Sequence, residues 1–215
     1  MPTLYTFFRS SASFRVRIAL NLKGVSYDPI VIGLSKGEQS GVDFMAVNPQ
    51  GLVPAWVDEN GVLAQSLAIM EYIDEKYPGS PLMPKDLAAR ARVRALAQLI
   101  ACEIHPLNNL RVLNHLRAEL KQTDAQVNTW YRHWIAQGLG MLERQLVLDD
   151  QAGRYMHGDT PGLADCCLVP QIFNAKRFDC DLSPYPKVMA IFDQCMTLSA
   201  FELAQPSKQP EASMY

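Results

Sequence analysis

Three serines stand near the start of the chain, where an apolar periodic segment begins. The stretch Arg9-Ser10-Ser11-Ala12-Ser13 follows a run of strand-forming residues and precedes a helix-like one. A helix N-terminus presents unpaired N–H groups and a partial positive charge, which stabilise an anion, and nearby hydroxyls can donate to that anion. Serine is also a preferred N-cap residue, so on this stretch alone capping is the favoured interpretation.

Two other short patterns are suited to an extended, negatively charged ligand. Val53-Pro54 precedes a predicted strand. If the peptide bond between these two residues is cis, the main chain of Val53 turns outward and offers an edge for such a ligand. A trans bond in an ordinary turn is the default interpretation. Gln65-Ser66 precedes a second helical segment, where the hydroxyl and the first N–H groups can hold a carboxylate. In isolation, capping by Ser66 is again favoured.

The first 82 residues alternate between strand-like and helix-like patterns that position these stretches. Strands are predicted over 3–8, 27–32, 55–58 and 62–64, and Asn60-Gly61 predicts a hairpin between the last two. Helices are predicted after Ser13, ending near Gly24, and from Ser66 to Pro78. The order predicts a small α/β domain with a mixed sheet over residues 1–82.

After residue 82 the pattern changes to helical periods without a convincing strand. Long helices are predicted after Asp86, over 124–147 and over 163–178, the last apolar nearly all round as in a buried central helix. The sequence therefore predicts a second, all-α domain over residues 86–215. The polar tail from Pro206 is expected to be extended.

Composition excludes several classes of function. The 215 residues include 20 Lys and Arg against 22 Asp and Glu, a net charge of -2, which argues against a strongly basic nucleic-acid binder. No apolar run approaches the roughly 18 residues that cross a bilayer, so no membrane association is expected. The start of the chain lacks the features of a signal peptide, which favours a cytoplasmic protein.

Cysteines, histidines and glycines indicate no metal or nucleotide chemistry. The five cysteines are odd in number and form no CxxC, which is typical of reduced, buried thiols rather than a disulfide framework. The four histidines never occur at metal-ligand spacing, so no metal is expected. The patterns GxGxxG, GxxxxGK[ST] and GxSxG are absent.

Taken together and in this order, the motifs resemble the glutathione transferase family, and within it the zeta class, which includes maleylacetoacetate and maleylpyruvate isomerases. The resemblance spans essentially the whole chain. The matching stretches are FRSSASFRVRIAL from Phe8, Asn48-Pro49, QSLAI from Gln65, PLNNL from Pro106, LVPQ from Leu168 and Arg177-Phe178. It implies a thioredoxin-like N-terminal domain joined to an all-helical C-terminal domain.

Two positions depart from the zeta pattern. Ala12 stands where the class has the cysteine of Ser-Ser-Cys, but the resemblance assigns thiolate activation to the first serine. In the helical domain, Gly162 precedes Asp165 by three residues, where the family has Ser or Thr as the helix cap. Glycine costs only a few tenths of a kcal/mol relative to serine at an N-cap, so folding is expected to survive.

The resemblance implies a role for each matched position. Ser10, helped by Ser11 and the helix N-terminus, would stabilise the thiolate of bound glutathione, and Arg9 would join them in the catalytic group as a cation facing the dianionic substrate and its enolate-like adduct. The residues expected to hold glutathione are Gln39 at its glycyl end, Val53 along the cysteinyl main chain, Gln65 and Ser66 at the γ-glutamyl end, and His105, Asn109 and Arg111 from the helical domain. Arg9, Arg111 and Arg177 are candidates for binding substrate carboxylates, since a guanidinium matches a carboxylate; for Arg177 a solvated or structural role is equally favoured.

The activity expected from the resemblance is cis–trans isomerisation of a dicarboxylic enone in aromatic-compound degradation. The glutathione thiolate adds to the conjugated double bond, the resulting single bond rotates, and the thiolate is expelled. Ala12 and Arg111 favour maleylpyruvate slightly over maleylacetoacetate. The alternatives are conjugation of glutathione to small electrophiles such as halogenated acids, a non-catalytic binding module, and a thiol oxidoreductase, which Ala12 disfavours. The resemblance also implies a homodimer.

Overall fold

The computed structural model describes residues 1–214, which form two compact units. The first contains Met1–Met83 and the segment from Met196 onward, and the second is Pro84–Cys195. The change of pattern near residue 82 therefore coincides with a structural boundary. The predicted extent of the helical domain, 86–215, differs at its C-terminal end, because the last segment packs with the first unit.

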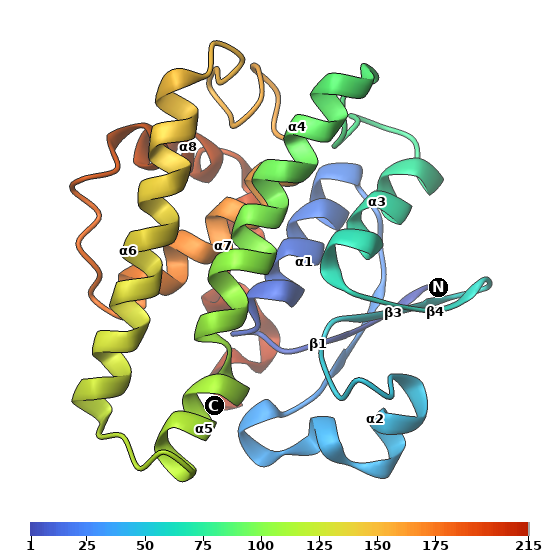
Figure 1. Ribbon diagram of the computed structural model, residues 1–215. Coiled ribbons are helices and arrows are strands. Elements are labelled where there is room, and N and C mark those ends of the chain that lie inside the picture. Colours follow the sequence, from blue (N-terminus) through green and yellow to red (C-terminus); the bar gives the residue numbers. More distant parts are fainter. Residues whose placement is uncertain (215) are drawn as a thin grey trace. The chain divides into compact units, whose positions relative to one another are not determined.

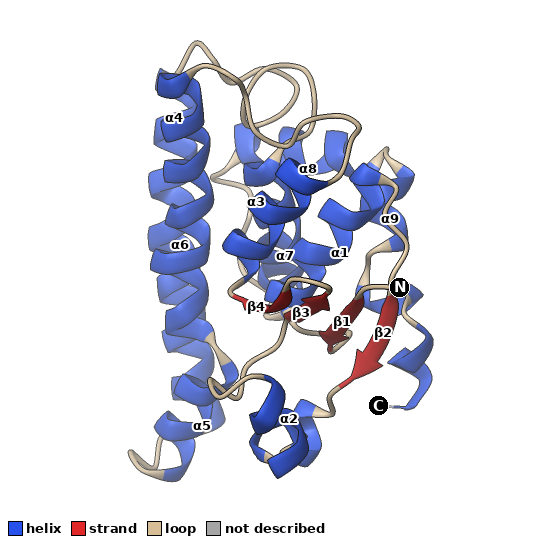
Figure 2. Ribbon diagram, turned by 90° about the vertical axis from the view of Figure 1, so that its right-hand side faces the viewer, coloured by secondary structure: helices blue, strands red, loops and turns tan. Residues whose placement is uncertain are grey.

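The first unit is built on a four-stranded mixed sheet with the strand order β2-β1-β3-β4. Strand β1 pairs in parallel with β2 and antiparallel with β3, and β3 and β4 form the predicted antiparallel hairpin. Helices α1 and α3 lie side by side on one face of the sheet and α2 lies on the other (Figures 1 and 2). The elements are β1 Thr3–Thr6, α1 Ser11–Lys23, β2 Asp28–Val31, α2 Val42–Val47, β3 Ala55–Asp58, β4 Gly61–Ala64, α3 Ser66–Lys76 and α9 Ser199–Leu203.

Helix α1 has a defined start and end. Its predicted start is Phe14, directly after Ser13. It begins three residues earlier, at Ser11, because Ser10 is the N-cap and its Oγ accepts a hydrogen bond from the Ser13 amide at 3.2 Å. It ends at Gly24, whose φ of 64° lies in the left-handed region that glycine adopts without a Cβ penalty. Apolar residues of α1, including Phe14 and Ile18, are buried in the unit.

The C-terminal tail is not extended, so that prediction is wrong. Its two prolines each begin a short 3₁₀ turn, Pro206–Lys208 and Pro210–Met214. Proline suits the first position of a helical turn because its φ is already set and its missing N–H is not needed there. The preceding helix α9 packs on α1, where the Asn21 side chain donates to the Ala200 carbonyl at 2.9 Å.

The second unit is helical throughout, as predicted, and residues 84–195 contain no strand. Helix α4 begins after its N-cap Asp86, and the predicted helices 124–147 and 163–178 are observed within one residue of their expected ends. The elements are α4 Leu87–Gln98, a π-helical turn Leu99–Ile104 (η3), a 3₁₀ turn His105–Asn108 (η4), α5 Leu110–Ala118, α6 Asp124–Leu148, α7 Leu163–Arg177 and α8 Pro186–Met196.

Close packing within this unit centres on α7, whose residues from Leu163 to Ile172 are all buried. Helix α6 approaches η3 closely at Gly138, where a Cβ would overlap the Ile104 side chain, so a larger residue needs Ile104 to move. On α6 the carboxylate of Glu143 accepts from the amides of Lys187 and Val188 at 2.9 and 2.8 Å, which satisfies the first turn of α8.

A buried carboxylate replaces the missing cap side chain of α7. Asp165 accepts hydrogen bonds from the amides of Gly162 at 2.8 Å and Met156 at 2.9 Å. Gly162 occupies the N-cap position without a side chain to return a bond. Burial raises the pKa of Asp165 to about 6, although the two amide bonds oppose that change. The departure at Gly162 is therefore accommodated by Asp165 acting alone.

This raised pKa predicts a stability that falls as pH rises through the acid range. Between about pH 4 and pH 6 the folded protein keeps a proton on Asp165 that the unfolded chain has lost, so folding becomes less favourable. The free energy of unfolding of the wild type minus that of Asp165→Asn should decrease by about 3 kcal/mol across this window. Urea unfolding at several pH values measures it, and a constant or increasing difference contradicts the prediction.

Candidate functional site

Ser10 occupies the junction between β1 and α1. Its Oγ accepts the cap bond from the Ser13 amide, which leaves the hydroxyl proton for another acceptor. Ser10 is partly exposed, and Ser11 behind it is 7% exposed. The capping interpretation is thus confirmed, and it is compatible with a role toward an anion, because the same side chain lies at the positive end of a 13-residue helix.

The residues leading into Ser10 are held by a buried arginine that sequence analysis did not identify. Arg17 is 1% exposed, and its guanidinium donates to the carbonyls of Phe7 at 3.4 Å and Phe8 at 3.0 Å. It also donates to Thr6 Oγ1 at 3.2 Å and to the Ala204 carbonyl at 3.1 Å. Burial lowers the pKa of Arg17 to about 10, so it remains charged at neutral pH.

The Val53-Pro54 peptide bond is cis, so the default expectation of a trans turn is wrong. Val53 directly precedes this bond and lies outside β3, which begins at Ala55. The main-chain groups of Val53 are therefore not part of the sheet ladder. That position fits the expected pairing with an extended ligand along the edge of the unit.

Ser66 does not cap α3, contrary to the expectation from the isolated motif. The N-cap is Gln65, and Ser66 is the first residue of the 11-residue helix. Ser66 is 6% exposed, and its Oγ accepts a hydrogen bond from Nη1 of Arg15 at 3.2 Å. Gln65 has a positive φ of 72°, which costs a non-glycine residue of order 1–3 kcal/mol, and residues held in such conformations cluster at active sites and ligand-binding positions.

Gln39, Gly51 and Gln65 are linked by close contacts around the Val53 segment. The Gln65 amide donates to Gln50 Oε1 at 2.7 Å. Gly51 has a φ of 62°, and a Cβ on it would lie 3.2 Å from the main-chain oxygen of Gln39. The side-chain oxygen of Gln39 is buried and has no hydrogen-bond partner among residues 1–214. A buried polar atom without a partner costs about 1–3 kcal/mol, which favours a ligand at this position.

These contacts bring together the predicted glutathione residues of the first unit. A tripeptide with two carboxylates needs main-chain pairing at its centre and donors at its ends. Val53 offers the pairing, and the Ser66 hydroxyl and the side-chain NH2 of Gln39 offer the donors, while the unpartnered Gln39 Oε1 can accept from a ligand N–H. The α1 N-terminus with Ser10 offers a donor for a thiolate. Arg9 is exposed, and its guanidinium lies 4.9 Å from the centre of the Phe8 ring. The residues present therefore fit glutathione.

A second group of predicted residues lies in the helical unit, where η4 meets α5. Asn109 is the N-cap of α5 and accepts from the Arg111 amide at 3.2 Å. Its side-chain nitrogen lies 3.3 Å from Nε2 of His105. Arg111 is exposed. The structure thus places His105, Asn109 and Arg111 together.

Arg177 is the last residue of α7 and is exposed, with its guanidinium 4.9 Å from the centre of the Phe178 ring. The Phe178 ring stacks on the ring of Tyr131 in α6, with 3.7 Å between the two ring centres. The same turn of α6 also contacts η4, because the side chain of Asn108, the last residue of η4, donates a hydrogen bond to the Tyr131 carbonyl at 3.2 Å. Arg177 and the His105–Asn109 group are therefore anchored to one turn of α6 within this unit.

Sequence reasoning missed Arg15, Arg17 and Gln50. The available signal was the alternation Arg15-Val16-Arg17 within an otherwise apolar helix, since a charge among buried positions is rare unless it has partners. The partners themselves lie up to 187 residues away in the chain, where no local pattern identifies them.

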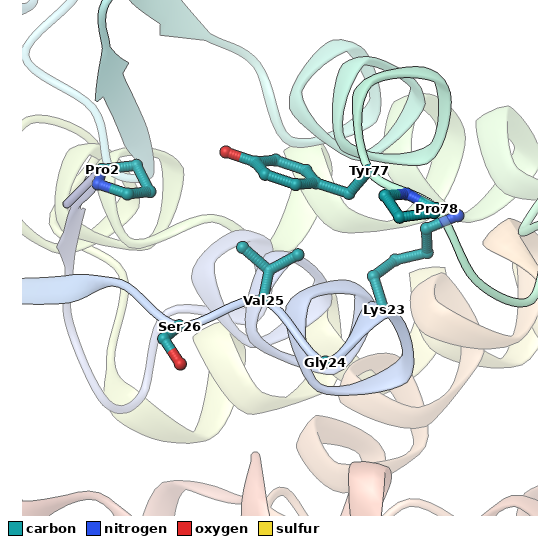
Figure 3. Close-up of a pocket in the computed structure, with 7 residues that line it drawn as sticks. All are labelled: Pro2, Lys23, Gly24, Val25, Ser26, Tyr77 and Pro78. Atoms are coloured by element: carbon teal, nitrogen blue, oxygen red, sulfur yellow. The ribbon is translucent and has the colours of Figure 1, made fainter.

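A shallow hollow of about 350 Å³ lies at the opposite ends of α1 and α3 (Figure 3). It is lined by Lys23, Gly24, Val25 and Ser26 after α1, by Tyr77 and Pro78 after α3, and by Pro2. Because α1 rises about 20 Å over its length, this hollow is remote from Ser10 and does not belong to the site.

Within residues 1–214, no helix is long and apolar enough to cross a membrane, and no group of three or more His, Cys, Asp or Glu side chains is placed to hold a metal ion. None of the five cysteines forms a disulfide. Burial raises the pKa of Cys166 well above its ordinary value, so this thiol is not poised to react.

Comparison with known proteins places nearly the whole chain in one family. The family model for the N-terminal domain of glutathione S-transferases matches residues 2–75. A maleylpyruvate isomerase of a Ralstonia species is 48% identical over 210 residues, covering 98% of this chain and 99% of the relative. The holo structure of a maleylpyruvate isomerase, a bacterial zeta-class enzyme, matches with a TM-score of 0.94 at 48% identity and covers 97% of this chain and 99% of that chain. The structure of a maleylacetoacetate isomerase of Methylobacterium extorquens with bound malonate and glutathione also matches with a TM-score of 0.94. It is 41% identical, and the match covers 97% of this chain and 98% of that chain.

Proposed function

This chain belongs to the zeta class of the glutathione transferase family, and we propose that it is a glutathione-dependent cis–trans isomerase of an unsaturated dicarboxylic acid. The observation that supports the proposal most directly is 48% identity to a maleylpyruvate isomerase over nearly the full length of both proteins. The fold is that of the family, with a thioredoxin-like unit and a helical unit.

Residues of the first unit hold glutathione in the proposed complex. Val53 pairs with the cysteinyl main chain, because its own main chain lies outside the sheet ladder. Ser66 donates to the γ-glutamyl carboxylate at the N-terminus of α3, with Gln65 beside it. Gln39 meets the glycyl residue, whose N–H can donate to the buried side-chain oxygen of Gln39. His105, Asn109 and Arg111 complete the proposed binding residues.

Ser10 is the proposed catalytic residue, with Ser11 in support. When bound, glutathione supplies a thiolate that can add reversibly to a conjugated double bond. The Ser10 hydroxyl donates to that sulfur, and the N-terminus of α1 favours its negative charge. A thiol of ordinary pKa, about 8.5, is only a few per cent ionised at pH 7, so lowering its pKa by ~2 units is worth about 2.7 kcal/mol.

Cationic side chains bind the carboxylates of the substrate in this proposal. Arg9, Arg111 and Arg177 are all exposed, so their guanidinium groups are accessible to a dicarboxylate. A guanidinium donates two parallel hydrogen bonds to one carboxylate, which holds the acid in a fixed orientation. Malonate, bound with glutathione in the Methylobacterium extorquens relative, is such a dicarboxylate.

We propose maleylpyruvate as the preferred substrate, ahead of maleylacetoacetate. Arg111 adds a charge where the mammalian-type zeta pattern has serine, and this suits the shorter and more compactly charged acid. Ala12 in place of the family cysteine is compatible with the mechanism because Ser10 activates the thiol. We also propose that the protein is a homodimer and that it is cytoplasmic. The cysteines, which form no disulfide, are in keeping with a reducing compartment.

The direct test of the function is isomerisation of maleylpyruvate and of maleylacetoacetate by the purified protein, with and without glutathione. Fumaryl products are expected only when glutathione is present, with the higher kcat/KM for maleylpyruvate. Turnover without glutathione would refute the proposed mechanism. A stable glutathione conjugate, or halide released from halogenated acids without isomerisation, would instead assign conjugation.

Ser10→Ala should lower kcat by about 100-fold, because the lost donor returns the thiol of bound glutathione toward its ordinary pKa. The Kd for glutathione should change little. The variant also loses a helix cap worth about 1 kcal/mol, so Asp86→Ala, which removes the cap of α4, is the matched control. If both variants keep wild-type kcat, Ser10 acts as a cap and nothing more.

Arg177→Met should raise KM for the dicarboxylic substrate by about 10-fold or more, because a charge-assisted hydrogen bond is worth about 1.5–3 kcal/mol. The Kd for glutathione should stay the same. Arg154→Met, which removes another exposed arginine of the same unit, is the control and should leave KM unaltered. An unchanged KM for Arg177→Met would remove this residue from the substrate site.

A further inference from the structure

Arg15 joins the two helices of the first unit on which the proposed glutathione site depends. It lies in the second turn of α1, is 2% exposed, and donates from Nη1 to the Oγ of Ser66 at 3.2 Å. The two helices lie side by side (Figure 1). This contact connects residues 51 positions apart in the chain and reaches the first residue of α3.

The chemistry of the guanidinium determines the direction of this hydrogen bond. A guanidinium has five N–H donors, has no acceptor and keeps its proton at all physiological pH values. The oxygen of Ser66 must therefore accept, and the hydroxyl proton of Ser66 must point to some other acceptor. That hydroxyl is not the cap of α3, because Gln65 occupies the N-cap position.

We propose that Arg15 is a positioning residue for glutathione binding: it orients the Ser66 hydroxyl as a donor toward the γ-glutamyl α-carboxylate. The positive charge of Arg15 also polarises that hydroxyl, because successive hydrogen bonds in a chain strengthen one another, so Arg15 acts on the carboxylate through Ser66. The inference rests on the proposed function, in which Ser66 meets this carboxylate.

The test is a double-mutant cycle on glutathione affinity, measured by calorimetry. Arg15→Gln removes the charge and lets the amide either donate to Ser66 or accept from it, so the orientation is lost. Arg15→Gln and Ser66→Ala should each weaken binding by about 10-fold, as expected for a charge-assisted hydrogen bond. The double variant should be no more than about twofold weaker than Ser66→Ala, because Arg15 acts through that hydroxyl. Arg15→Lys, which keeps a cation that only donates, should restore most of the affinity.

A matched control separates this role from general support of helix packing. Lys23 of α1 joins the same two helices at their other ends through a buried ion pair, in which its Nζ lies 3.0 Å from Asp74 Oδ1. Figure 3 shows Lys23 beside the hollow that lies after the C-terminal ends of α1 and α3. Lys23→Gln should lower the thermal midpoint and leave the Kd for glutathione within about twofold. If Lys23→Gln weakens binding as much as Arg15→Gln does, Arg15 has only a structural role and the proposal fails.

A second ligand identifies the group that Ser66 recognises. The probe is 4-aminobutyryl-cysteinyl-glycine, which is glutathione without the α-carboxylate of its γ-glutamyl residue. The wild type should prefer glutathione to this probe by about 10-fold or more, and Ser66→Ala should lose most of that preference. This measurement tests the proposal even if Arg15→Gln does not fold, because an unchanged preference in Ser66→Ala overturns it.

The outcomes also separate this inference from the function on which it rests. A wild-type protein that does not bind glutathione refutes the proposed function itself. A wild type that binds glutathione, together with an unchanged Kd in Arg15→Gln or additive losses in the cycle, refutes the role of Arg15 alone.

Discussion

The burial of positive charge in helix α1 is the constraint on which the N-terminal unit depends. A guanidinium removed from water must be surrounded by acceptors, and Arg17 has four of them within 3.4 Å. Three belong to Thr6, Phe7 and Phe8, and the fourth is the carbonyl of Ala204. The need to satisfy this charge therefore ties together the end of β1, the segment leading to Ser10 and the C-terminal segment of the chain.

The same helix serves the site at its other buried arginine. Arg15 reaches Ser66 on α3, while the N-terminus of α1 itself is formed by Ser10. Both helix N-termini are thus attached to one rigid element, and both favour negative charge. A tripeptide that presents a thiolate and a carboxylate matches two such positions. Gln39 and Val53 are joined to them through the contacts of Gly51 and Gln65 with their neighbours.

In the helical unit, buried carboxylates replace conventional caps. Asp165 and Glu143 each accept from main-chain amides at the beginning of a helix, in one case because glycine stands at the N-cap. The helices of this unit form a frame that carries its exposed arginines. Arg177 ends α7, and Arg111 lies in the first turn of α5. The frame is thus stabilised by charges directed inward, while Arg111 and Arg177 are exposed on its surface.

Local patterns in the sequence were sufficient for the elements. Helical periods and cap residues predict α4, α6 and α7 closely, and Asn60-Gly61 predicts the hairpin of β3 and β4, because these features depend on neighbours a few residues apart. The order of the motifs along the chain was sufficient to identify the family. Only the tertiary structure shows that Ser66 accepts from Arg15 instead of capping a helix, that Val53-Pro54 is cis, and that α9 packs on α1. Each of these features depends on partners 51 to 187 residues away or on the surroundings of a single peptide bond. The local periodicity of the sequence contains no information about either.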